Sequence, residues 1–143
     1  MFIPYLTDTL TRATPWRTQN SGERWAPIVP TSILYREFES RVFGAMVDSG
    51  AEVTLFQASL GERLGIPVRS GPSEIYQGFT GKDAELTYFH QVRLRVAGTT
   101  ITTVVGFCYA LPVNALLGRV GFFDHFKITF DPLRRGMQID RAG

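Results

Sequence analysis

The stretch Val42-Phe43-Gly44-Ala45-Met46-Val47-Asp48-Ser49-Gly50-Ala51 decides the fold, because an apolar run ends in it at an acidic residue and a turn. A carboxylate at the end of a buried strand loses solvation, so it needs hydrogen-bond partners or a proton. Gly50 lets the backbone bend without steric cost, and Ser49 can hydrogen-bond within the turn. The pattern predicts a rigidly held carboxylate at the edge of a cavity, although a strand that simply ends in a turn gives the same tripeptide.

A second element, Ala115-Leu116-Leu117-Gly118-Arg119, lies far along the chain and favours chemistry over an ordinary turn. Together the two elements resemble the retropepsin-like aspartic proteases, the single-domain relatives of retroviral proteases. That family has Asp-Thr/Ser-Gly-Ala after a hydrophobic hairpin, then a flap, and later two apolar residues followed by Gly, often Gly-Arg. The same features occur here in the same order, over roughly residues 28–140. The resemblance implies a closed, all-β acid protease barrel with one short helix and an active site at a two-fold dimer interface.

Length and composition fit a single globular domain. The chain has 143 residues, of which 44% are hydrophobic and 20% are charged, as in ordinary soluble proteins. Fifteen basic and thirteen acidic residues leave a formal charge of +2, which is too small and too scattered to indicate a nucleic-acid partner.

Cofactor and compartment signals are absent from the sequence. Cys108 is the only cysteine, so an intrachain disulfide is impossible, and its apolar surroundings predict a buried, inert thiol. His90 and His125 lack metal-ligand spacing, so we expect no metal and no other cofactor. The first residues lack a charged leader, and no run approaches the ~18 apolar residues of a membrane span. We therefore expect a cytoplasmic protein without a membrane partner.

The chain divides into an arm and a body. Residues 1–27 are rich in Thr, Arg, Pro, Asn and Ser and predict an irregular N-terminal arm, which could be a removable pro-segment, a dimer-clasping strand or a flexible tail. Residues 28–143 would form the protease domain. Short apolar runs with regular turn signals indicate an all-β sandwich or barrel in this part. Strands are predicted over 28–35, 38–47, 51–56, 74–77, 84–96, 99–109, 126–130 and 137–140, and one helix over 57–64.

Aspartic proteolysis requires two carboxylates that share one proton and activate one water. Only Asp48 follows an apolar strand and precedes Ser-Gly; the other aspartates, Asp8, Asp83, Asp124, Asp131 and Asp140, lie in other contexts. A homodimer with two-fold symmetry would supply the second carboxylate, with Asp48 of each subunit at the axis.

The resemblance assigns roles to the residues after Asp48. Ser49 would hydrogen-bond across the dimer, and the Gly50 amide would reach the carboxylate. Ala51 would line the substrate pocket. Glu52 could form an ion pair with Arg119, or the two side chains could be independently solvated.

Two further segments complete the predicted site. Leu116 and Leu117, followed by Gly118, would support the active site as core packing. The tip of the hairpin formed by 74–77 and 84–96 would act as a flap over the substrate, with Phe79 or Tyr76 covering the site by a ring. The tip residues are Gly78, Phe79, Thr80 and Gly81.

The sequence therefore predicts an aspartic endopeptidase that hydrolyses protein or peptide substrates as a homodimer. The alternative is a non-catalytic homodimeric β-barrel used for binding or scaffolding, in which the acid is retained structurally.

Overall fold

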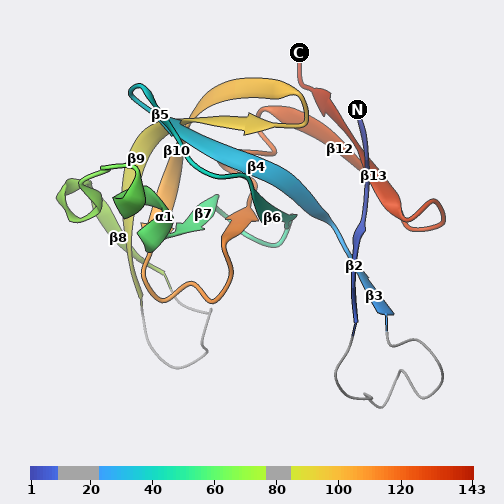
Figure 1. Ribbon diagram of the computed structural model, residues 1–143, viewed down its shortest axis with the longest axis horizontal. Coiled ribbons are helices and arrows are strands. Elements are labelled where there is room, and N and C mark those ends of the chain that lie inside the picture. Colours follow the sequence, from blue (N-terminus) through green and yellow to red (C-terminus); the bar gives the residue numbers. More distant parts are fainter. Residues whose placement is uncertain (10–22, 77–84) are drawn as a thin grey trace.

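The computed structural model describes residues 1–9, 23–76 and 85–143, and its regular structure is nearly all β-strand (Figure 1). Helix α1 (Ala58–Arg63) and the 3-10 turn η1 (Val68–Ser70) are the helical elements of the described ranges, so the expected all-β fold with one short helix is confirmed. No helix in these ranges is long and apolar enough to cross a membrane. The strands are β1 (Phe2–Pro4), β2 (Leu6–Thr9), β3 (Glu23–Ala26), β4 (Ile28–Tyr35), β5 (Phe38–Glu39), β6 (Phe43–Val47), β7 (Leu55–Gln57), β8 (Ser73–Tyr76), β9 (Glu85–Val96), β10 (Thr99–Cys108), β11 (Ala115–Leu117), β12 (Phe126–Asp131) and β13 (Gly136–Arg141).

Six of the strands close into a barrel. The main sheet has the order β5-β4-β6-β11-β7-β10-β9-β8, and β4 also pairs with β9. This closing contact is antiparallel and runs from Thr31 opposite Val96 to Leu34 opposite Arg93. The ring is therefore β4-β6-β11-β7-β10-β9, and closure leaves these strands without a free edge over the paired residues. The predicted closed barrel is confirmed.

One apolar core fills the barrel and continues under the C-terminal strands. In the first part of β10 the residues Ile101, Thr103 and Val105 are buried while Thr100, Thr102 and Val104 are exposed, as expected for a strand with one face in the core. Phe56 and Phe107 are fully buried, with ring centroids 6.0 Å apart. Phe122, Met137 and Ile139 belong to the same buried cluster, so the small sheet of β1, β13 and β12 packs on the barrel.

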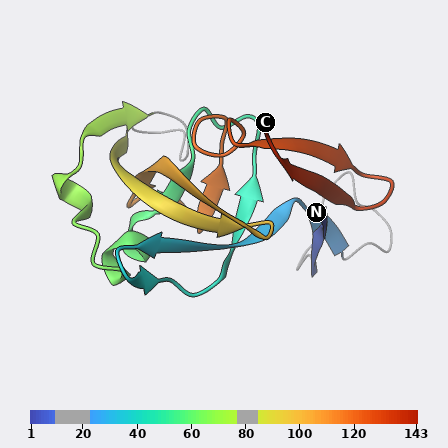
Figure 2. The ribbon, with the colours of Figure 1, turned by 90° about the horizontal axis from the view of Figure 1, so that it is seen from above.

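The N-terminal residues are built into the fold where they are described, which differs from the expected irregular arm. β1 pairs antiparallel with β13, and β2 pairs with β3, because the C-terminal hairpin supplies a partner that local composition cannot reveal. Both ribbon views place the start of the chain beside this hairpin (Figures 1 and 2). The Arg134 guanidinium lies 4.2 Å from the Phe2 ring centroid, and that of Arg135 lies 4.3 Å from the Trp25 ring.

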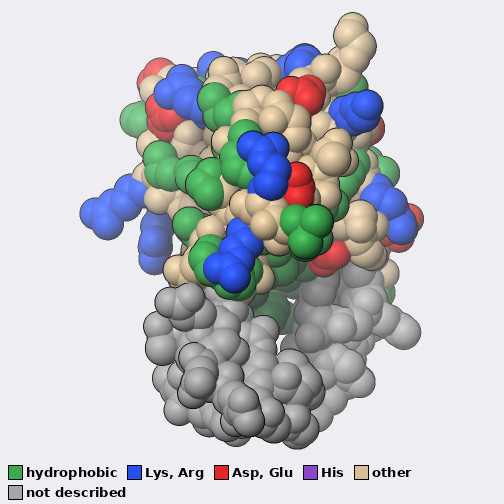
Figure 3. Space-filling model, turned by 90° about the vertical axis from the view of Figure 1, so that its right-hand side faces the viewer, with side chains coloured by type: hydrophobic (Ala, Val, Ile, Leu, Met, Phe, Trp, Pro, Cys, Tyr) green, Lys and Arg blue, Asp and Glu red, His purple; other side chains and the backbone are tan. Residues whose placement is uncertain are grey.

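Figure 3 shows one face of the molecule, on which Lys or Arg side chains lie against hydrophobic ones. The two contacts are cation–π interactions. They tie the start of the chain to the tip between β12 and β13. The division into residues 1–27 and 28–143 stays a prediction.

Two predicted strands have different bounds in the structure. The run 38–47 breaks at 40–42, because the Ser40 hydroxyl accepts the hydrogen bond of the Ile33 amide at 2.9 Å in place of a backbone carbonyl. The run 51–56 becomes a strand only from Leu55, since its first half is a turn in which Val53 makes an isolated bridge to Val120. The helix is confirmed: Gln57 precedes α1, and its side chain accepts from the Ser59 amide at 2.6 Å.

Candidate active site

The acidic turn lies at the end of β6, beside a strand from the second half of the chain. β11 lies between β6 and β7 in the sheet, parallel to β6 and antiparallel to β7. Leu117 pairs with Val47, so the chain positions that follow them, Gly118 and Asp48, leave the sheet together. β11 therefore runs directly beside the end of β6, next to the turn that begins at Asp48.

Backbone hydrogen bonds fix the Asp48 loop, defined here as residues 48–54, along much of its length. The Asp48 amide donates to the Leu117 carbonyl at 3.0 Å, before the loop turns. After the turn, backbone hydrogen bonds join the loop to the segment that follows β11, with donors on both sides. These bonds are Arg119 N to Ala51 O at 2.9 Å, Val120 N to Glu52 O at 2.9 Å and Thr54 N to Val120 O at 2.9 Å.

The Asp48 carboxylate is half-buried and held by the turn that it precedes. Its Oδ1 atom accepts a hydrogen bond from the Gly50 amide at 2.9 Å, while Ser49 and Gly50 are exposed. Within 1–9, 23–76 and 85–143 the carboxylate accepts no other hydrogen bond, so Oδ2 has no partner in this part of its own chain. A carboxylate fixed at one oxygen and open at the other can take up a water or a second carboxyl group.

Two buried positions support the loop, of which Gly118 was predicted as a supporting residue and Thr54 was missed by sequence reasoning. Thr54 is fully buried, and its hydroxyl accepts from the Gly118 amide at 3.0 Å. A Cβ atom at Gly118 would lie 2.3 Å from the Val53 carbonyl oxygen, so only glycine fits there without movement of backbone. A polar residue within the apolar-alternating run 51–56 was the available signal for Thr54.

The possible ion pair between Glu52 and Arg119 is not formed. The two residues bond through backbone atoms of the loop, and both side chains are exposed. The Arg119 guanidinium instead points toward the Ser49 carbonyl oxygen, at 3.5 Å. An ion pair in solvent gains little over separate hydration, which explains why the backbone ladder alone sets the approach of the two segments.

Leu116 and Leu117 face opposite sides of β11. Leu117 is fully buried in the main core, as predicted for a residue packed beneath the site. Leu116 is half-buried and packs in a second, smaller cluster with Leu55, Cys108 and Leu111. Cys108 is 1% exposed, so the expected buried thiol is confirmed.

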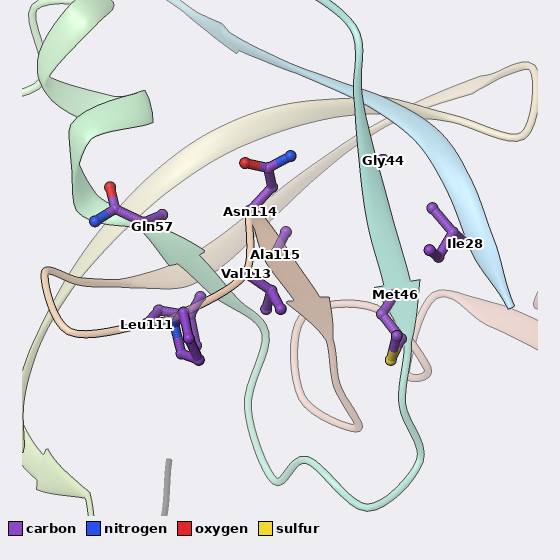
Figure 4. A pocket seen from close by; sticks show the side chains of 9 residues that line it. Ile28, Gly44, Met46, Gln57, Leu111, Val113, Asn114 and Ala115 are labelled. Atoms are coloured by element: carbon purple, nitrogen blue, oxygen red, sulfur yellow. The ribbon is translucent and has the colours of Figure 1, made fainter. Parts of the chain in front are cut away.

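A cavity of about 390 Å³, here called the first cavity, lies beside β6. Gly44 and Met46 alternate with the buried Ala45 and Val47, and therefore lie on the same face of the strand as position 48. Figure 4 shows these two residues on β6, with the chain that leads into β11 across from them. The lining residues are Ile28, Gly44, Met46, Gln57, Leu111, Pro112, Val113, Asn114 and Ala115.

The loop that borders the first cavity is anchored at both ends to Gln57, the last residue of β7. The Gln57 amide donates to the Asn114 carbonyl oxygen at 2.9 Å, and its side chain donates to the Tyr109 carbonyl oxygen at 3.0 Å. The Tyr109 phenol donates to the Glu62 carboxylate, and this hydrogen bond raises the pKa of Tyr109 above its ordinary value. The Arg69 guanidinium lies 4.2 Å from the Tyr109 ring centroid.

The residues predicted to form the flap tip are not among those that the structure describes. These are Gly78, Phe79, Thr80 and Gly81. The arms that lead to the tip, β8 and β9, pair antiparallel from Ser73 opposite Tyr88 to Tyr76 opposite Glu85.

The histidines take structural positions. His90 Nε2 lies 2.8 Å from the Val68 carbonyl oxygen, and its ring meets that of Phe107 edge to face. His125 lies 3.8 Å from Asp124. In the described part of the chain, no three His, Cys, Asp or Glu residues gather as metal ligands would.

The comparisons with known proteins identify the family of the chain. The sequence model of a family described as aspartyl protease matches residues 37–119, which include both the Asp48 loop and β11. The chain belongs to this aspartyl protease family. A search of curated proteins gives no match.

Solved structures give the fold. The retroviral protease-like domain of Ddi1 from Leishmania major is 19% identical, with a TM-score of 0.59, and the match covers 82% of this chain and 90% of that one. The EIAV protease complexed with the inhibitor HBY-793 is also 19% identical, with a TM-score of 0.47, over 66% of this chain and 82% of that one. The retropepsin-like fold implied by the sequence is confirmed.

Proposed function

We propose that this protein is an aspartic endopeptidase whose active site forms from the Asp48 carboxylates of two identical subunits. The observation that carries the proposal is the state of Asp48: half-buried, held at Oδ1 by the Gly50 amide, and open at Oδ2 within the described chain. Family membership supports the same reaction class.

The need for a second copy follows from the other aspartates. Asp124 accepts from the Gly121 amide at 3.1 Å, and Asp131 accepts from the Arg134 amide at 3.1 Å, so each closes a turn of its own. Asp140 is bound by the Gln138 side chain at 2.8 Å. A two-fold axis beside the Asp48 loop would instead bring two equivalent, unengaged oxygens together.

The reaction requires the pair to hold one proton. Two carboxyl groups in contact cannot both ionise, so one is acid while the other is base. The ionised Asp48 takes a proton from a water, whose oxygen attacks the scissile carbonyl carbon. The protonated Asp48 stabilises the oxygen of the tetrahedral intermediate and its proton passes on to the leaving amine as the C–N bond breaks. Such acid–base assistance typically contributes ~10²–10⁴-fold in rate.

The neighbouring residues act on position and substrate. Ser49, exposed at the turn, hydrogen-bonds across the dimer and locks the two loops. Ala51 and Glu52 contact the substrate in the cleft. The segment 116–119 holds the loop from behind through the backbone bonds described above.

The first cavity supplies a side-chain subsite. It shares the strand face of Asp48, and its walls are mostly apolar, including Ile28, Met46 and Val113. An apolar side chain of the substrate gains about 25 cal/mol for each Å² of surface that it buries there. The preferred cleavage site therefore contains an apolar residue close to the scissile bond.

The test is Asp48→Asn, which removes the acid but keeps the shape. We expect loss of cleavage of a peptide library, measured by mass spectrometry, with unchanged circular dichroism and sedimentation. Asp140→Asn makes the same chemical change on the exposed face of β13 and should cleave like wild type.

Mixing the subunits tests the shared site. Excess Asp48→Asn protein added to a fixed amount of wild type should capture wild-type subunits in inactive mixed dimers and lower the rate. If the rate is unchanged although mixed dimers form, or if Asp48→Asn cleaves like wild type, the proposal is wrong.

A further inference from the structure

A second cavity, of about 590 Å³, lies between helix α1 and the chain that leads into β6. Its apolar lining includes Leu60 and Leu64 of the helix side and Phe43 at the start of β6. Val42, also in the lining, is 69% exposed. The remaining lining residues are Glu39, Ser40, Arg41, Arg63 and Asn114.

The two cavities are neighbours along one strand. Asn114 lines both of them, and Figure 4 shows it at the border of the first cavity, between Gln57 and Gly44. Val42 lines the second cavity, and Gly44 and Met46, two and four positions later in the chain, line the first. At about 3.3 Å per residue, an extended peptide beside β6 would pass from one cavity to the other in about three residues.

The second cavity carries uncompensated positive charge. Arg41 and Arg63 are exposed, and neither forms an ion pair within the described ranges. The one carboxylate of the lining, Glu39, is already bound: Arg95 lies 2.8 Å from its Oε1 atom, and the Ser32 hydroxyl donates to the same atom at 2.9 Å. A lining that combines two arginines, unpaired in the described part of the chain, with apolar residues matches an acidic side chain with apolar neighbours.

We propose that this second cavity is a substrate subsite that selects an acidic residue. Arg41 and Arg63 bind the carboxylate of an Asp or Glu side chain, because guanidinium groups form charge-assisted and often bidentate bonds with carboxylates. Preferred substrates then combine an apolar residue in the first cavity with an acidic residue about three positions away. The inference rests on the proposed peptidase function, which it deepens by naming the substrate class.

The test compares peptides that differ only by Glu or Gln, scanned across the positions on either side of an apolar cleavage site. Wild type should show about tenfold higher kcat/KM for Glu at one of these positions, mainly through KM, and less at high salt. The Arg41→Gln, Arg63→Gln double variant should lose that preference, so that its kcat/KM is the same for the Glu and the Gln peptide. Lys127→Gln, which removes an exposed cation on β12, should keep the preference.

Direct binding separates this proposal from the proposed function. Anisotropy of labelled peptides measured with the Asp48→Asn protein reports affinity without turnover. Arginine-dependent binding of the Glu peptide supports the subsite even if wild type cleaves nothing. Cleavage without any Glu preference, or with a preference that survives the double substitution, overturns the subsite alone. Dissociation of the dimer in the double variant also overturns it, because the cavity would then be a subunit contact.

Discussion

The hydroxyl of Thr54 accepts a hydrogen bond from the amide of Gly118 at 3.0 Å, in the buried region where the Asp48 loop packs against the segment after β11. Thr54 precedes β7 and Gly118 follows β11, so this bond joins the end of the loop to the segment after β11. It also satisfies an amide that has no access to water, since both residues are buried.

Replacing Thr54 by Val should destabilise the protein by about 1–3 kcal/mol, because the buried Gly118 amide loses its acceptor. Thr54→Ser keeps the hydroxyl and should lose less. Chemical denaturation of both variants measures the difference. Equal stability of the Val and Ser variants would contradict a structural role for the hydroxyl.

Gly118→Ala should also cost about 2–3 kcal/mol, because the added methyl meets the carbonyl oxygens of Val53 and Ala51, which belong to backbone and cannot rotate away. Gly44→Ala is the matched comparison on the neighbouring strand. Its methyl meets only the Cγ2 atom of Ile28, at 2.7 Å, and should cost less because this side chain borders the first cavity and has room to move. Thermal unfolding measures the loss of stability in the two variants. A larger loss for Gly44→Ala would show that the backbone around Gly118 can move to admit a methyl group.

The bond between Tyr109 and Glu62 predicts a pH effect. The carboxylate can accept a hydrogen bond only from the neutral phenol, and this raises the pKa of Tyr109. The stabilising contact is therefore complete below the ordinary tyrosine pKa of about 10 and is lost as the pH rises through the raised value.

Glu62→Gln should move the pKa of Tyr109 down toward its ordinary value, which NMR of ¹³C-labelled tyrosine can follow. Glu37→Gln, at an exposed carboxylate in the turn after β4, should leave the titration unchanged. If the pKa of Tyr109 is the same in wild type and in Glu62→Gln, the contact does not form in solution.

Local patterns were sufficient for much of the fold. The run 28–35 is an apolar and β-branched segment, and β4 has the same bounds. Gln57 and Gly65 bracket the helix by chemistry that acts within a few residues, so α1 was predictable too. The family resemblance then supplied the order of the strands around Asp48.

Contacts between distant residues were not predictable in this way. Val53 lies in a run of alternating apolar and polar residues, which is typical of a strand. Its neighbours, however, form backbone hydrogen bonds with the segment after β11, so this part of the run is a loop. The same ladder leaves Glu52 and Arg119 as solvated side chains. The arm was predicted as irregular because the partner of β1 lies at the other end of the chain. The second cavity was likewise hidden, since Arg41, Arg63 and Asn114 come from three separate segments.

The insertion of β11 between β6 and β7 has a consequence for biosynthesis. Ribosomes extend a chain at about 5–20 residues per second, so Asp48 leaves the tunnel several seconds before Leu117 can join it. During that interval the acidic turn lacks the amides and carbonyls that later hold it. A nascent or prematurely terminated product would thus carry the acid without its scaffold, and unfinished translation would yield no competent hydrolytic centre.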